Sequence, residues 1–307
     1  MAHYRPVRFI RQGETFVPTD SVELALAELV DLVLTRLAEQ GIRDTTLHKE
    51  WEAIRQIKPE EAEFCLASAR LGLDPYSEGL ELSDMLVQVS DTLQGCLFED
   101  FMNAVNPRHI EAGLEWIEQG SRRIEDRPDS IGQIAELRST LSPAISISTK
   151  RPWEVAYAKA REVRGILGLD SDKSFNFDGW LALAEQASGD RGLQALGGIS
   201  RQDSPVLVLG RPMLEESSRF AQGRAFWRFL AEGEEARFLL TTAYTDRQRV
   251  ERAFAAELLA PAEGILQQLE FDDGPVSPED LEAVGKSFGV SSWVIHHQIE
   301  NQLLWLA

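Results

Sequence analysis

The chain has 307 residues, of which 43% are hydrophobic and 26% are charged, a composition typical of a folded globular protein. This length allows two domains of ordinary size. The formal net charge is −19, with −11 on residues 1–150 and −8 on residues 151–307. Neither half is a basic module, so the charge distribution argues against nucleic acid as a partner.

The sequence also bears on the compartment. No apolar run approaches the roughly 18 residues that a membrane-spanning helix needs. The first sixteen residues carry scattered charges instead of the apolar core of a signal peptide. Cys65 and Cys96 are the only cysteines, which implies no disulfide framework and fits a reducing compartment. We therefore expect a cytoplasmic protein that has no membrane partner.

Helical periodicity dominates the first half. Residues 19–41 have apolar side chains at three- and four-residue steps, which predicts a helix with one buried stripe formed by Val22, Leu26, Leu29, Val33 and Leu37. Similar patterns predict five more helices, at residues 45–57, 58–75, 80–95, 106–120 and 129–141. The segment VRFI, residues 7–10, is the one strand candidate. We predict an N-terminal helical bundle over residues 1–140, followed by a Ser-, Thr- and Pro-rich linker at residues 141–151.

The second half, residues 152–307, mixes helices with short strands. Glycine, proline and serine bound three apolar segments that predict strands, at residues 193–200, 204–210 and 237–244. Helical patterns occupy residues 153–170, 177–187, 219–230, 246–259, 278–288 and 291–304. The predicted fold class is mainly α, of the α+β type, with the helical bundle followed by a domain in which a small sheet packs on helices.

Three motifs in the second half resemble those of a known family. They are Arg219-Phe220 at the start of a helix, FAAELLAP at residues 254–261 and FGVS at residues 288–291. In this order they resemble the ImmA/IrrE-type metallopeptidases, zinc proteases that cleave helix-turn-helix repressors. The resemblance covers residues 152 to about 300, and FAAELLAP is its most specific part. It implies a metallopeptidase-like domain.

The resemblance further implies where a zinc site would lie. In that family two histidines four residues apart hold Zn²⁺, the glutamate between them takes a proton from the metal-bound water, and a following helix supplies a third ligand. The matching positions here are Arg224, Ala225 and Arg228, with Gln248 near the third ligand. Guanidinium groups repel a cation, and Ala225 cannot act as a base. We therefore expect no metal, no other cofactor and no catalytic residue: a pseudoenzyme.

Two arrangements of the arginines remain open. Because Arg224 and Arg228 are four residues apart, they share one helix face. With Arg219 they could line a cleft that binds an acidic peptide, a carboxylate or a phosphate. The other arrangement is internal ion pairing with carboxylates such as Glu251 or Glu257.

The favoured function is a non-catalytic regulatory module that binds a protein partner, such as a transcription factor or a toxin–antitoxin component. One alternative is an active metallo-endopeptidase with an unconventional site, which a one-to-one zinc content would support. The other is a DNA-binding regulator, because residues 278–304 also resemble a helix-turn-helix. The second helix of that pair begins SSWVIHHQIE, with serines and bulky apolar residues where a DNA reader carries Arg, Lys, Asn or Gln.

Overall fold

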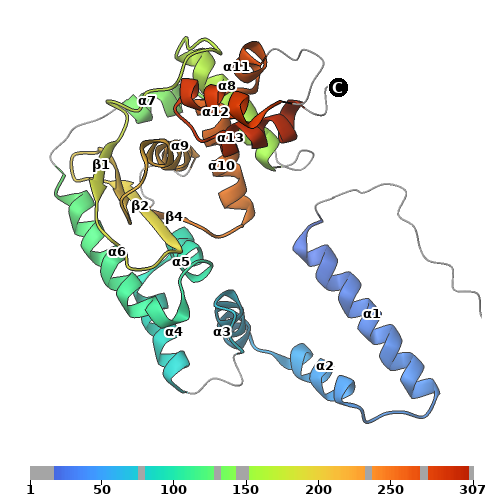
Figure 1. The fold of residues 1–307 in the computed structure, drawn as a ribbon. Coiled ribbons are helices and arrows are strands. Elements are labelled where there is room, and N and C mark those ends of the chain that lie inside the picture. Colours follow the sequence, from blue (N-terminus) through green and yellow to red (C-terminus); the bar gives the residue numbers. More distant parts are fainter. Residues whose placement is uncertain are drawn as a thin grey trace, which may run out of the picture. The chain divides into compact units, whose positions relative to one another are not determined.

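The computed structural model describes residues 17–74, 80–127, 133–142, 152–231, 237–269 and 276–303. The chain forms two compact units, Met1–Glu63 and Phe64–Ala307. Most of the described residues are helical, and one small mixed sheet lies in the second unit (Figure 1). The predicted fold class, mainly α of the α+β type, is confirmed. No helix in the described part of the chain is both long and apolar enough to cross a membrane.

The first unit contains a helical hairpin of α1 (Thr19–Glu39) and α2 (Thr46–Gln56). The Thr45 side chain caps α2 by accepting a hydrogen bond from the backbone N–H of His48. Asp31 on α1 links the two helices, because its carboxylate accepts hydrogen bonds from the Trp51 indole at 2.8 Å and from the Arg55 guanidinium at 3.1 Å.

The predicted buried stripe on α1 is wrong. Val22, Leu26, Leu29 and Val33 are exposed, and only Leu37 is half-buried. The periodicity correctly predicts the helix, but it cannot say whether a neighbouring element covers the apolar face. Among the described residues of this unit, α2 is the only other complete helix, and it covers a different side of α1.

The second unit begins with a group of short helices. They are α3 (Pro59–Arg70), which starts in the first unit, α4 (Leu80–Thr92), α5 (Gly95–Met102), the 3₁₀ turn η1 (Pro107–His109), α6 (Ile110–Glu125) and α7 (Gln133–Thr140). The amphipathic helix α6 buries Leu114, Trp116, Ile117 and Ile124. These side chains share one core with the sheet, so α6 is a structural layer of this unit.

Four strands form the sheet, in the order β1 (Ala182–Glu185), β3 (Pro205–Leu209), β2 (Leu193–Ile199) and β4 (Phe238–Thr241). β1 runs parallel to β3, whereas β2 is antiparallel to both β3 and β4. Alternate side chains enter two different cores: Leu196 and Val208 pack with α6, and Ala195 and Leu207 pack with α9. Helices therefore cover both faces of the sheet (Figure 1).

The helix predicted at residues 177–187 is wrong, because residues 182–185 form strand β1. Leucine, alanine and glutamate favour a helix, but Leu181 and Leu183 belong to one core while Ala182 and Ala184 belong to the other. This alternation has the period of a strand, and pairing with β3 overrides the weak local preference.

The remaining helices are α8 (Pro152–Ile166), α9 (Glu215–Ala231), α10 (Asp246–Leu259), α11 (Ala262–Gln268), α12 (Pro278–Phe288) and α13 (Ser292–Gln298), which continues into the π-helical turn η3 (Ile299–Leu303). α10 packs against both α8 and α9. A capping box of Ser277 and Asp280 starts α12, and Gly289, with φ of 67°, ends it.

The two compact units do not coincide with the predicted domains, residues 1–140 and 152–307. α5 packs on β4 and α6 packs on β2 and β3, so part of the predicted N-terminal domain covers the sheet of the predicted C-terminal one. Of the predicted linker, residues 141–151, the structure describes only residues 141 and 142. The strand predicted at residues 7–10 lies wholly outside the described residues.

Candidate functional site

The residues that match the zinc motif lie on two helices in close contact. α9 carries Arg224, Ala225 and Arg228, and α10 carries Gln248. The helices approach each other at Gly223, where an added Cβ would lie 2.9 Å from the Cβ of Ala255. Only a glycine leaves room for this approach, which places the next residue of α9 directly against α10.

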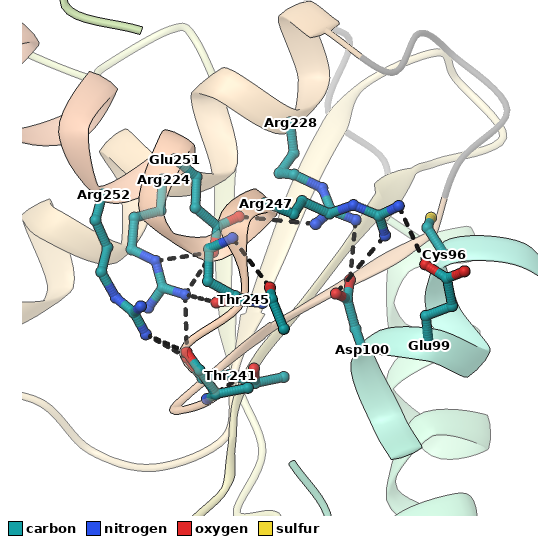
Figure 2. A network of polar contacts seen from close by, with 12 residues as sticks. Cys96, Glu99, Asp100, Arg224, Arg228, Thr241, Thr245, Arg247, Glu251 and Arg252 are labelled. Carbon is teal, nitrogen blue, oxygen red and sulfur yellow. Dashed lines mark hydrogen bonds and ion pairs between the residues drawn. The ribbon is translucent and has the colours of Figure 1, made fainter. Parts of the chain in front are cut away.

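Arg224 is buried and is bonded by several groups of its own chain. Its Nη2 lies 2.5 Å and its Nε lies 3.2 Å from Oε1 of Glu251 on α10. Nη1 donates to the side-chain oxygen of Gln194 at 2.6 Å, and Nη2 also donates to the carbonyl oxygen of Thr241 at 3.1 Å and to Oε1 of Gln248. Figure 2 shows several of these contacts converging on one guanidinium group.

Arg228 lies one turn further along α9 and is completely buried. Its Nη2 lies 3.0 Å from Oδ2 of Asp100 on α5, and its Nη1 lies 3.7 Å from Oε2 of Glu251. The guanidinium also sits over the ring of Phe238, 4.9 Å from the ring centre. Asp100 is shared, because Nη1 of Arg247 lies 3.8 Å from its Oδ1 (Figure 2). We call Asp100, Arg224, Arg228, Arg247 and Glu251 the arginine network.

The acidic members of the network depend on the arginines. Burial raises the pKa of the Glu251 carboxyl, and the charges of Arg224 and Arg228 oppose that rise. Burial likewise raises the pKa of Asp100, opposed by Arg228 and Arg247. Removing the guanidinium groups would leave two buried carboxyl groups with no opposite charge. The network is therefore a set of mutually dependent charges.

The sequence left open whether Arg224 and Arg228 line a binding cleft or pair with carboxylates of the chain. In the structure they form internal ion pairs. Glu251 is a partner of both Arg224 and Arg228, as the sequence allowed. Glu257 is not: its carboxylate binds Arg161 at 2.7 Å and the amide of Gln298 at 2.8 Å. A ligand-binding role for the arginines stays a prediction, and these contacts lend it no support.

The other predicted site residues separate into two groups. Gln248 is buried beside Arg224, and Ala225 is buried in the apolar core. Arg219 lies apart from the network, because it donates to the carbonyl oxygen of Gly289 at 3.2 Å and to the hydroxyl of Ser174 at 2.6 Å. Arg219 therefore ties the start of α9 to the turn after α12.

Sequence reasoning missed Asp100, because it predicted no helix at residues 95–102. A signal was present. In the segment CLFEDFM, residues 96–102, Glu99 and Asp100 interrupt an apolar run, and an acid inside such a run indicates a buried, paired charge. The pairing itself joins residues 128 positions apart, so no local pattern could identify Arg228 as the partner.

A surface hollow of about 470 Å³ lies elsewhere in the described part of the second unit. Its lining residues are Ala104, Asn106, His109, Gly189, Asp190, Arg191, Gly192 and Thr242. The buried Asp190 carboxylate accepts hydrogen bonds from the backbone N–H groups of Asn106 and Gly192 and contacts Nδ1 of His109 at 3.2 Å. Asp190 thereby fixes the loop between β1 and β2, and none of the predicted site residues lines this hollow.

The residues at the motif positions do not fit a zinc ion. Two of the three implied ligand positions carry guanidinium groups, which cannot coordinate a cation, and both groups are already paired with carboxylates. Across the described residues, no group of three or more His, Cys, Asp and Glu side chains could hold a metal ion. No protein-family model matches the chain, and no curated protein matches it.

Proposed function

We propose that this chain is a non-catalytic relative of the ImmA/IrrE metallopeptidases and acts in the cytoplasm as a protein-binding regulatory module. One observation carries the proposal. The two positions that match the histidine ligands hold arginines, and these arginines are neutralised by Glu251 and Asp100 inside the protein. A charge network thus occupies the place where the family binds the metal that activates water.

Two contacts support the residue-by-residue correspondence with the family. Gln248, matched near the third ligand, bonds to Arg224, matched to the first ligand. In the FAAELLAP segment Ala255 lies against Gly223, so this motif and the motif helix are packed together. Glu251 pairs with Arg224 and Arg228, and Gln248 bonds to Arg224, so the three matched positions are linked by direct contacts.

A regulatory role suits a protein that has an enzyme's fold but lacks the catalytic residues, because such a protein acts by binding partners at its surface. The acidic chain favours a partner with a basic surface, since complementary charge speeds association and selects partners. The DNA-binding members of two partner classes, transcription factors and toxin–antitoxin components, meet this description, because a protein that binds DNA carries a basic surface. In this proposal the chain binds its partner without cleaving it.

No observation favours either alternative function. An unconventional peptidase site would need metal ligands or a base at the motif, and the matched side chains are two arginines, an alanine and a glutamine that is bonded to Arg224. For DNA binding, the second helix of the C-terminal pair, α13, would present polar groups to bases. Gln298 at its end is instead buried, where its amide donates to Glu257 and to the carbonyl oxygen of Ala260.

The test is capture of the partner from the native cells, with chemical cross-links to locate the contact. The proposal predicts a partner recovered intact and in stoichiometric amount. The purified chain, incubated with that partner with or without a chelator, should leave it uncleaved. Chelator-sensitive cleavage would overturn the non-catalytic assignment, and failure to capture any stoichiometric partner would overturn the binding role.

A further inference from the structure

The surface hollow of about 470 Å³ in the second unit carries polar groups that the proposed function does not use. We call it the Asp190 hollow. It lies between three segments: residues 104–109, residues 189–192 and Thr242, which directly follows β4. Its volume falls within the range of small-molecule sites, about 300–1,000 Å³. The hollow is therefore large enough for a small ligand.

The three segments are fixed against one another by contacts within the protein. Gly192 packs so closely on Ala104 that an added Cβ would overlap the Ala104 carbonyl oxygen. Thr242 donates its backbone N–H to the carbonyl oxygen of Gly192 at 3.0 Å. Arg252 donates to the carbonyl oxygen of Ala243 at 2.9 Å, which holds the chain just after Thr242. A hollow that is already shaped costs less ordering free energy when a ligand binds.

The Asp190 carboxylate is 4% exposed, and its hydrogen bonds lie within the protein. It accepts from the backbone N–H of Asn106 at 3.0 Å and of Gly192 at 2.6 Å, and it contacts Nδ1 of His109 at 3.2 Å. Because a carboxylate only accepts hydrogen bonds, this contact places a proton on Nδ1 and leaves Nε2 as the second ring nitrogen. Asp190 thereby orients the half-exposed imidazole of His109 at the hollow.

The other lining side chains offer hydrogen-bond donors. Oδ1 of Asn106 accepts from the backbone N–H of Arg108 at 3.0 Å, so the remaining atom of the amide, Nδ2, is a donor. Neither Nδ2 nor the exposed Arg191 guanidinium has a partner among the residues that the structure describes. Thr242 adds a hydroxyl, and Nε2 of His109 donates whenever the ring is protonated. Donors from all three segments, one of them a permanent positive charge, favour an anionic ligand.

We propose that the Asp190 hollow binds a small phosphate monoester, whose phosphate group is held by Arg191, His109 and the amide of Asn106. A phosphate group has three strong acceptor oxygens and a charge of about −1.5 to −2 at neutral pH, so it can accept from several directions at once. A carboxylate has only two oxygens. Because the chain carries −19, its overall field repels an anion, and binding depends on these local groups. The site is independent of the proposed function.

Isothermal titration calorimetry of the full chain, in a phosphate-free buffer at neutral pH, tests the site. The probes are inorganic phosphate and glycerol 3-phosphate, and both should bind saturably with a dissociation constant below about 1 mM. Acetate should bind at least tenfold more weakly. Arg191→Ala and His109→Ala should each raise the dissociation constant for glycerol 3-phosphate about tenfold or more, because each removes a charge-assisted hydrogen bond.

Arg201→Ala is the matched control. Arg201 is an exposed arginine beyond the opposite end of β2, paired with Glu125 and outside the hollow, so this variant should bind glycerol 3-phosphate as the wild type does. Arg191→Ala should keep the wild-type melting temperature, which separates lost binding from unfolding. The proposal is overturned by a wild type that binds neither probe saturably, by acetate binding as tightly as phosphate, or by binding that both hollow variants retain.

Discussion

Arg224 on α9 and Glu251 on α10 form a buried ion pair, with 2.5 Å between Nη2 and Oε1. The same carboxylate contacts Arg228 with its other oxygen at 3.7 Å. One glutamate thus stands between the two arginines that match the histidine ligands of a zinc protease. In the proposed correspondence, these ion pairs lie at the positions where the family would hold its metal.

Removing both arginines should destabilise the second unit. In Arg224→Ala with Arg228→Ala, Glu251 loses both of its paired arginines while staying buried, and Asp100 keeps only Arg247 at 3.8 Å, so the free energy of unfolding should fall by about 3–5 kcal/mol. Urea denaturation at neutral pH measures this. Arg211→Ala, an exposed arginine near the same helix, is the control and should have little effect.

Adding Glu251→Gln to that double variant should recover part of the lost stability, because the stranded carboxylate is then neutral. If the double variant unfolds with the wild-type midpoint, the ion pairs of the network contribute nothing measurable to stability. If Glu251→Gln brings no recovery, the loss comes from packing of the guanidinium groups and not from charge.

Glu162 on α8 provides a pH-dependent prediction. Burial alone would raise its pKa, but hydrogen bonds from Lys159 at 2.8 Å and from the backbone N–H of Ser142 at 2.7 Å outweigh burial and lower the pKa to about 2. A lowered pKa stabilises the folded state above the unfolded value, near 4.5, and this contribution is lost as pH falls toward 2.

Glu162→Gln should therefore reduce the free energy of unfolding at pH 7 by about 1.5 kcal/mol. The difference from the wild type should shrink between pH 4.5 and pH 2, where the wild-type carboxylate takes up its proton. Urea midpoints across this range measure the effect. If the difference in free energy of unfolding between variant and wild type stays constant with pH, the charge of Glu162 does not contribute to stability.

Binding to DNA of random sequence should be negligible at physiological salt. The two halves of the chain carry −11 and −8, so few phosphates could be neutralised and few counterions released. Gel retardation and fluorescence anisotropy with a random duplex are suitable measurements. Retardation at micromolar protein and near-physiological salt would contradict the prediction and revive the DNA-binding alternative.

Much of the helical architecture follows from local sequence signals. The predicted bounds of α10 and α12 agree with the structure because strong local caps define them: Thr245 begins α10, and Ser277 and Gly289 flank α12. The strands β2 and β3 were also predicted, since turn residues bound their apolar runs. In each case the determining interactions lie within a few residues of one another.

The failures share a different physical origin. β1 depends on pairing with β3, and the burial or exposure of the predicted apolar stripe on α1 depends on its neighbours, so neither is encoded locally. At the site, the helix face shared by Arg224 and Arg228 was predictable, but the partner Asp100 comes from α5, far away in the chain. A charge network assembled from distant segments requires the tertiary structure.

The zinc content of the purified full chain tests the central claim most directly. The protein is incubated with equimolar zinc, passed through gel filtration and assayed by elemental analysis. Because Arg224 and Arg228 occupy both matched histidine positions and are paired with Glu251 and Asp100, we expect no stoichiometric zinc and a melting temperature that chelators leave unchanged. About one tightly held zinc per chain, removed by a chelator with loss of stability, would contradict the pseudoenzyme account.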